Sequence, residues 1–325
     1  MTRREFISLI GSAAAWPLAA RAQQPAIPVI GFLGSRASGE DPQLLISFRL
    51  GLKEAGYVEG QNVVVDYRFA DNQYDRLPAL AAELVQRRVT LIAANGPAVQ
   101  AAKAATSSIP IVFTVGFDPV EVGLVASMNR PGGNITGVSI LDVELGPKRL
   151  ELLRELVPKA AIVAVLVNPA DPVRAGNISR AVQTAARTLG LQSDVLQASN
   201  ERDFDEVFAS LLQMRADGLV IGGEPFFNSR SEQLGALTAR HKVPAIFQFR
   251  EFTVGGGLAS YGASLTESYR EVGVYAARIL KGERPADLPI VQPSKFELMI
   301  NLKTAKALGL VVPAKLLFTA DETIE

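Results

Sequence analysis

Residues 29–56, VIGFLGSRASGEDPQLLISFRLGLKEAG, hold the pattern that decides the fold. An apolar run over Val29–Leu33 leads into a loop of small residues and then into Asp41-Pro42, which supplies a helix N-cap and a first-turn proline. Gly56 ends the helix. Apolar residues recur inside it at helical spacing, namely Leu44, Leu45, Phe48 and Leu52. The stretch predicts a strand, a loop and an amphipathic helix.

The same unit is repeated along the chain, because short β-branched runs alternate with amphipathic stretches. This alternation predicts right-handed βαβ units around parallel sheets. The first series of expected strands is Val29–Leu33, Val63–Phe69, Thr90–Ala94, Ile109–Val115 and Ile135–Ile140. The second series is Ile162–Val167, Gln192–Leu196, Gly218–Ile221, Pro244–Phe247 and Leu258–Tyr261. The expected fold class is α/β, with two Rossmann-like lobes whose parallel sheets are flanked by helices.

Four further helix starts directly follow expected strands: Asp118-Pro119 with Glu121, Asp171-Pro172, Ser229 with Glu232, and Ser264 with Glu267. In an open parallel sheet, the loops after the strand ends line the ligand crevice, and helix N-termini there offer free N–H groups to anions. The residues in or beside these loops are the candidate ligand contacts: Ser35, Asn95, Gly96, Phe117, Asp118, Asn168, Glu224, Phe226 and Tyr261.

The first 22 residues resemble a twin-arginine signal peptide. Thr2-Arg3-Arg4-Glu5-Phe6-Ile7 precedes a short apolar stretch and the small-residue cleavage site Ala20-Arg21-Ala22. The apolar stretch is too short to span a bilayer, and the chain has no cysteine to carry a lipid anchor. We therefore expect export to the periplasm, removal of the leader near Gln23, and a free mature protein.

Composition excludes several classes of function. Without the expected leader the net charge is about −2, which gives no indication of nucleic acid or of an anionic membrane as a partner. There is no cysteine, and the single histidine, His241, lies at a basic helix end where it caps carbonyls or faces solvent. The loop Gly34–Gly39 lacks the Gly-Lys-Ser/Thr ending of a phosphate-binding loop. No catalytic residue, metal ligand or cofactor is predicted.

Several dispersed motifs resemble one large family. They are Arg49–Val63 (RLGLKEAGYVEGQNV), Asp75–Val85 (DRLPALAAELV), Ile109–Phe113 with Asp118-Pro119-Val120, Arg130–Asn134, Lys148–Leu153, Phe296–Leu298 and the closing stretch Asn301–Leu310. Together they are similar to the ABC-transporter substrate-binding family with the type I periplasmic-binding-protein fold, whose relatives include tryptophan-binding proteins. The resemblance spans nearly the whole mature chain.

The resemblance implies two lobes joined by three crossings, with a ligand cleft between them. It places the N-terminal lobe at residues 27–140 plus 260–288 and the C-terminal lobe at 141–259 plus 289–325. Ligand contacts of the family map to Ser35, Asn95, Asp118, Asn168 and Glu224. The implied partners are a small-molecule ligand and an ABC permease in the inner membrane, with the protein itself a monomer.

The leading hypothesis is a periplasmic receptor that closes around a small polar or zwitterionic metabolite, such as an amino acid or aromatic acid, and delivers it to a permease. Helix N-termini near Ser35 or Asp118 would hold a carboxylate, an acidic side chain an ammonium, and Phe226 or Phe117 an apolar part. Two alternatives remain open from the sequence: an exported hydrolase or isomerase on the same fold, and a sensor module that presents its ligand to a membrane receptor.

Overall fold

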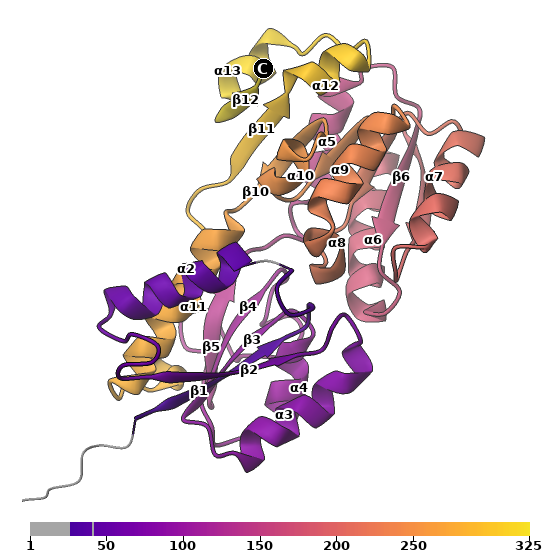
Figure 1. The fold of residues 1–325 in the computed structure, drawn as a ribbon. Coiled ribbons are helices and arrows are strands. Elements are labelled where there is room, and N and C mark those ends of the chain that lie inside the picture. The colour runs from indigo at the N-terminus through magenta and orange to yellow at the C-terminus, as the bar shows by residue number, and fades with distance from the viewer. Residues whose placement is uncertain (1–26, 41) are drawn as a thin grey trace, which may run out of the picture.

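The computed structural model describes residues 27–40 and 42–325, so the expected leader at 1–22 and the expected cap Asp41 lie outside the described residues. Figure 1 shows two lobes, each built on a sheet with helices on both faces. The predicted α/β class with two Rossmann-like lobes is confirmed. None of the described helices is long and apolar enough to cross a membrane.

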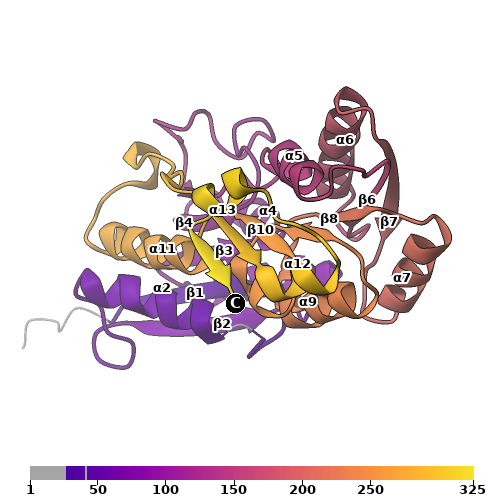
Figure 2. The ribbon, with the colours of Figure 1, turned by 90° about the horizontal axis from the view of Figure 1, so that it is seen from above.

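The first lobe has five parallel strands in the order β2-β1-β3-β4-β5. The strands are β1 (Val29–Gly34), β2 (Val64–Phe69), β3 (Leu91–Asn95), β4 (Ile111–Val115) and β5 (Ile135–Ser139). The helices and 3₁₀ turns are α2 (Pro42–Glu54), η1 (Tyr74–Arg76), α3 (Leu77–Gln86), α4 (Ala98–Ala105), α11 (Leu265–Leu280) and η2 (Pro285–Asp287). Helices α3 and α4 cover one face and α2 and α11 the other, so β3, β4 and β5 are buried throughout. Helix α11 lies along α2 in both views (Figures 1 and 2).

The second lobe has seven strands in the order β12-β11-β10-β9-β8-β6-β7. The strands are β6 (Ile162–Val167), β7 (Gln192–Gln197), β8 (Gly218–Ile221), β9 (Ala245–Phe247), β10 (Ala259–Gly262), β11 (Glu297–Asn301) and β12 (Glu322–Ile324). The helices are α5 (Gly146–Leu156), α6 (Pro172–Thr188), α7 (Asp203–Gln213), α8 (Pro225–Ser229), α9 (Ser231–Arg240), α10 (Arg250–Val254), α12 (Leu302–Ala307) and α13 (Ala314–Thr319). Helices α5 and α6 pack on one face, and α7, α8 and α9 on the other.

All ten predicted strands are present, and their ends fall within two residues of those expected. Strands β11 and β12 were not predicted. Strand β11 pairs antiparallel with β10, and β12 is parallel to β11, so these C-terminal strands extend the second sheet without a βαβ unit that joins them to β10.

The helix starts at Asp171 and Ser264 are confirmed. The Asp171 side chain accepts a hydrogen bond from the Arg174 N–H at 3.1 Å, and Ser264 Oγ accepts one from the Glu267 N–H at 3.2 Å. The start at Ser229 is wrong. Ser229 is the last residue of α8, and its hydroxyl donates to the Phe226 carbonyl, while α9 begins two residues later without a side-chain cap.

The helix start at Asp118-Pro119 is also wrong, because the chain forms only turns there. Asp118 Oδ1 does accept hydrogen bonds from the N–H groups of Val120 and Glu121, as a cap would. The chain then adopts a positive φ of 69° at Gly123, and the next two N–H groups both return to the Pro119 carbonyl. The left-handed glycine therefore ends the turn before a helix can propagate.

The chain passes between the sheets three times: after β5, after β10 and after η2. Ser260, where the expected first lobe resumes, lies inside β10 and thus in the second sheet; the segment that packs on the first lobe begins at Leu265. Residues 290 and 291, expected in the second lobe, still hydrogen-bond to Met128, Gly137 and Ser139 of the first.

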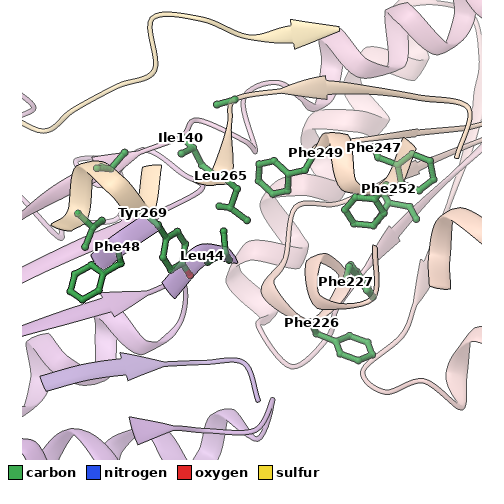
Figure 3. Close-up of a cluster of buried hydrophobic side chains, with 14 of the residues drawn as sticks. Leu44, Phe48, Ile140, Phe226, Phe227, Phe247, Phe249, Phe252, Leu265 and Tyr269 are labelled. Carbon is green, nitrogen blue, oxygen red and sulfur yellow. The ribbon is translucent and has the colours of Figure 1, made fainter. Parts of the chain in front are cut away.

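An apolar cluster continues from one lobe into the other. Figure 3 shows Leu44, Phe48 and Tyr269 of the first lobe, then Ile140 and Leu265 near the crossings, and Phe249 and other phenylalanines of the second lobe. Leu44, Ile140, Phe249 and Leu265 are each no more than 9% exposed. The lobes therefore share an apolar contact on the crossing side, and polar side chains of their strand-tip loops also meet across the boundary.

Candidate ligand site between the lobes

Ser35 and Asn95 form one fixed unit at the tips of β1 and β3. The backbone N–H and the hydroxyl of Ser35 both donate to Asn95 Oδ1, at 2.9 and 3.0 Å. The Asn95 amide donates in turn to the Tyr269 hydroxyl. Both side chains are buried, so this pair holds the two strand tips of the first lobe in place.

Glu224 connects the lobes. It caps α8 of the second lobe, where its Oε2 accepts the Phe226 N–H at 2.7 Å. Its Oε1 accepts the hydroxyl of Tyr74 from the first lobe, and Asn168 provides a further side-chain hydrogen bond. The carboxyl is 2% exposed. Both oxygens are therefore occupied by protein groups, one of them across the lobe boundary.

Burial raises the pKa of Glu224 above its usual value, although hydrogen bonds from Tyr74 and Asn168 and the charge of Arg174 act to lower it. The same environment raises the pKa of the Tyr74 phenol, first through burial and then through the adjacent Glu224 carboxylate. Tyr74 therefore keeps its proton and remains the donor in this contact.

A cavity of about 470 Å³, here called the interlobe cavity, lies between the two lobes. Its lining from the first lobe includes Tyr74, Leu77, Pro78, Pro97 and Phe117, and that from the second includes Asp171, Pro172, Val173, Arg174 and Asn177. Its volume falls in the range of small-molecule sites. A neighbouring groove of about 590 Å³ runs between α5 and α6 and shares Phe117, Val122, Val143 and Asn177 with this cavity.

Arg174 is the cationic side chain in the lining of the interlobe cavity. Its guanidinium lies 5.8 Å from the centre of the Phe117 ring, and its side chain reaches from α6 to the first lobe. The residue is 7% exposed, and its Nε is buried without a hydrogen-bond partner in the described part of the chain. It also lies in the first turn of a helix, where the macrodipole disfavours a cation. An anionic group in the cavity would offset both costs.

Three glycines at the lobe boundary allow the backbones of the two lobes to approach each other closely. A Cβ on Gly96, whose φ is +50°, would lie 2.9 Å from Pro225 of the opposite lobe. A Cβ on Gly116 would collide with the Arg174 guanidinium, and one on Gly223 with the Asp142 carboxylate. The strand-tip loops are therefore shaped for backbone contact, and any side chain at these positions would hold them apart.

The structure brings Ser35, Asn95, Gly96, Phe117, Asn168 and Glu224 together at the lobe boundary. Of these six, Phe117 lines the interlobe cavity and the other five lie outside its lining. Phe226, expected to cover a ligand, packs inside the second lobe on Phe204 with ring centres 5.7 Å apart. The Tyr261 ring lies against Phe296, 6.2 Å away, and outside the lining of the interlobe cavity. Asp118 is half-buried, and its side chain accepts from its own turn, while its N–H donates to Glu144.

Tyr74, Asp142 and Arg174 were missed by the sequence analysis. Tyr74 lies in a short 3₁₀ turn beyond β2, and Asp142 lies in the crossing after β5. The sequence did contain a signal for Arg174. Arg174 lies three residues after the N-cap Asp171, where the helix dipole disfavours a positive charge, and a cation at such a position indicates a role other than helix stability.

Two Rossmann-like lobes with three crossings, whose strand-tip loops enclose a shared cavity, define a protein of the type I periplasmic-binding fold. Residues 45–324 match the model of the family described as ABC transporter substrate binding protein. The chain belongs to this family.

Individual relatives and solved structures are similar to this chain in sequence or in fold. A tyrosine-binding protein of Clostridioides difficile (strain R20291) is 29% identical over 271 residues, which cover 81% of this chain and 75% of that protein. An ABC domain from Streptococcus pneumoniae in complex with L-Trp has a TM-score of 0.81 at 22% identity and covers 92% of this chain and 100% of that one. A conserved domain protein from Vibrio cholerae has a TM-score of 0.81 at 25% identity, over 91% and 99% of the two chains. The ligand-free, open structure of a Clostridium difficile substrate-binding protein with adhesive properties has a TM-score of 0.64 at 25% identity, over 92% and 100%.

Proposed function

We propose that this protein is the periplasmic solute-binding component of an ABC importer, and that it captures an amino acid with an aromatic side chain between its lobes for delivery to an inner-membrane permease. The observation that carries the proposal is Arg174, a buried guanidinium that lines the interlobe cavity with an unpartnered Nε. Family membership and the Clostridioides difficile relative, a tyrosine-binding protein, support the same reading.

The interlobe cavity offers complementary surfaces for such a ligand. Arg174 would bind the carboxylate through charge-assisted hydrogen bonds. Phe117, Tyr74 and three prolines of the lining would cover an aromatic ring. Burial of an aromatic side chain contributes about 4 to 6 kcal/mol before the cost of association is subtracted. Binding and closure require no bond to be made or broken, so the proposal contains no catalytic step.

Closure would seal the ligand from water through contacts that the two lobes already make. The Tyr74–Glu224 hydrogen bond crosses the boundary, and so does the ion pair between Arg230 and Glu40, with 2.6 Å between Nη1 and Oε1. A ligand that binds the closed form better than the open form shifts the equilibrium toward closure. Delivery to the permease then requires the lobes to reopen.

A ligand panel on protein that starts at Gln23 tests the proposal. Thermal shift and calorimetry would compare L-tyrosine, L-tryptophan and L-phenylalanine with L-leucine, L-glutamate and a sugar. We expect one or more aromatic amino acids to raise the melting temperature by several degrees, because a ligand bound only by the folded state stabilises it. No shift with any amino acid, together with turnover of ester or glycoside substrates, would replace this proposal with the exported enzyme.

A further inference from the structure

The interlobe cavity continues into the groove between α5 and α6, two helices that lie side by side (Figure 2). Phe117, Val122, Val143 and Asn177 line both spaces, and these four residues are here called the junction. The groove, at about 590 Å³, is larger than the cavity of about 470 Å³ that it joins. A solute held in the interlobe cavity therefore has a second space of comparable size open to it.

Helix α6 forms one wall of both spaces. Residues three or four positions apart share one face of a helix, and the residues of this face are Arg174, Asn177, Ala181, Thr184 and Thr188. Arg174 and Asn177 line the interlobe cavity, and Asn177 and the three residues after it line the groove. The face extends about 21 Å at a rise of about 1.5 Å per residue. Because a residue of an extended chain adds about 3.5 Å, this wall can accommodate more than one amino acid.

Asn177 lies at the junction with its side-chain amide available. The residue is half-buried, and its side chain makes no hydrogen bond to protein within residues 27–40 and 42–325. An amide side chain both donates and accepts hydrogen bonds, as a peptide group does. Asn177 follows Arg174 by about 4.5 Å along the helix axis, close to the length of one extended residue. A peptide group one residue before a carboxylate at Arg174 would therefore face Asn177.

The chemistry of the groove defines what can lie beyond that peptide group. The apolar side chains of its lining, apart from Phe117, are Val122, Val143, Pro147, Ala181, Ala185 and Leu189. The carboxylates of Glu121, Glu144 and Glu151 line it as well, against the guanidinium of Arg180. This combination favours an apolar or basic side chain and disfavours an acidic one.

We propose that the protein binds dipeptides whose C-terminal residue is aromatic, with that residue in the interlobe cavity and the N-terminal residue in the groove. The inference rests on the proposed function and extends its ligand from one amino acid to two. Arg174 binds the C-terminal carboxylate, Asn177 binds the peptide group, and the groove takes the N-terminal side chain. L-tyrosine alone fills only the interlobe cavity.

The test compares L-tyrosine with three dipeptides by calorimetry on protein that starts at Gln23. Leucyl-tyrosine should bind about 10-fold more tightly than L-tyrosine, because burial of its leucine side chain outweighs the cost of fixing it. Tyrosyl-leucine has the same composition in the reverse order and should bind at least 10-fold more weakly than leucyl-tyrosine. Glutamyl-tyrosine brings a carboxylate to the acidic groove and should lose the gain.

A variant that fills the groove locates the N-terminal residue. Ala181→Trp places a ring one helical turn beyond Asn177, so it should weaken leucyl-tyrosine about 10-fold and change L-tyrosine less than two-fold. Arg187→Trp is the matched control, since it adds the same ring to an exposed position of α6 that lies outside both linings. It should leave the affinities for both ligands unchanged. Because both ligands are measured on each variant, an effect on folding cancels from their ratio.

Asn177→Ala provides an independent test if Ala181→Trp does not fold. It removes no hydrogen bond within the described part of the chain and should weaken leucyl-tyrosine about 3- to 10-fold more than L-tyrosine. A leucyl-tyrosine affinity no better than that of L-tyrosine or of glutamyl-tyrosine, or equal losses of both ligands in the two variants, would overturn the dipeptide assignment and leave the proposed function intact. Failure of L-tyrosine, the dipeptides and the whole amino-acid panel to bind would overturn the proposed function itself.

Discussion

At the scale of single residues, the positive charge of Arg174 lies in the first turn of α6, where the dipole of that helix disfavours a cation. Arg174→Met keeps much of the apolar stem and removes the charge. We expect the dissociation constant for L-tyrosine to rise about 10- to 100-fold, because a charge-assisted contact to the carboxylate is lost. Calorimetry provides the measurement.

The matched control is Arg180→Met, on the same helix. Arg180 lines the neighbouring groove between α5 and α6 and is absent from the lining of the interlobe cavity. Its substitution should change the affinity less than two-fold, as is usual for an exposed site. Equal losses in the two variants would show that the charge of α6 as a whole, and not a contact made by Arg174, governs binding.

Glu224 should make ligand affinity depend on pH. Its pKa is raised above 4.5 by burial in the closed form, against the hydrogen bonds of Tyr74 and Asn168 and the charge of Arg174. Opening of the lobes admits water and returns the pKa of Glu224 toward 4.5. At a pH between 4.5 and the raised pKa, closure is therefore coupled to the uptake of a proton by Glu224. The closed form is therefore favoured at the acid end, and affinity should fall as the pH rises through the raised pKa. Calorimetry at a series of pH values should show this slope in wild type, and a persistent slope in Glu224→Gln would assign it to another group.

The sequence could predict the site residues that lie at the end of a strand or within three residues after it. Ser35, Asn95 and Glu224 occupy such positions, and parallel strands bring their ends to one edge. Phe226 follows the same rule but turns into the core, because α8 directs its ring against Phe204. Arg174 and Asp142 escaped prediction because Arg174 lies inside a helix and Asp142 lies in a crossing. Only the packing of the two lobes against each other places both residues at the lobe boundary.

At the scale of elements, close approach of the β3–α4 loop to α8 should depend on Gly96. In Gly96→Ala the new Cβ would lie 2.9 Å from Pro225, whose ring cannot turn aside, and the backbone would keep an unfavourable φ of +50°. We expect about a ten-fold loss of L-tyrosine affinity, because the lobes no longer close fully. Gly190→Ala is the control, since its φ of +68° imposes similar backbone strain with nothing within 4 Å.

Both glycine variants should lose comparable stability, and only Gly96→Ala should lose affinity. Thermal unfolding and calorimetry on the two proteins separate these quantities. A similar loss of affinity in Gly190→Ala would mean that general destabilisation, and not the contact between lobes, lowers binding.

Elements were predictable where local chemistry and long-range packing agree. Asp171-Pro172 begins a helix as expected because the next residues can continue it. Asp118-Pro119 has the same local signal, but the segment forms only turns. Gly123 is left-handed, and the N–H groups of the next two residues both donate to the Pro119 carbonyl. Strand β11 escaped prediction because its pairing with β10 is antiparallel and follows a crossing through the other lobe.

At the scale of the whole molecule, Arg230 links the lobes through an ion pair with Glu40 and also pairs with Glu201 of its own lobe. Burial acts to raise the pKa of Glu40, but hydrogen bonds from Arg230 and the Ala37 N–H outweigh it and hold the pKa below its usual value. Glu40→Gln should speed ligand dissociation about three-fold, since a partly exposed pair contributes up to about 1 kcal/mol. Stopped-flow release of L-tryptophan would measure it.

Glu201→Gln removes the other partner of the same arginine and should leave the release rate nearly unchanged, because that pair does not cross between lobes. High salt should reduce the difference between wild type and Glu40→Gln. Equal effects of the two substitutions would contradict a role for Glu40 in holding the lobes together.

The two-lobed architecture was predictable because ten strands with intervening helices exceed one sheet of ordinary size. The exact lobe boundaries were not, since β10 belongs to one sheet while α11, a few residues later, packs on the other. Only the pairing of β10 with β9 and β11 fixes that boundary, and no local pattern encodes it.

The central claim is that the lobes close on one solute between them. The chain has no cysteine, so spin labels at Ala79→Cys in the first lobe and Arg202→Cys in the second, both exposed, can report the distance between lobes without interference. Titration with L-tyrosine should shift the distance distribution to one shorter, narrower population that saturates at one ligand per chain. A distribution that stays unchanged at saturating L-tyrosine would contradict the account.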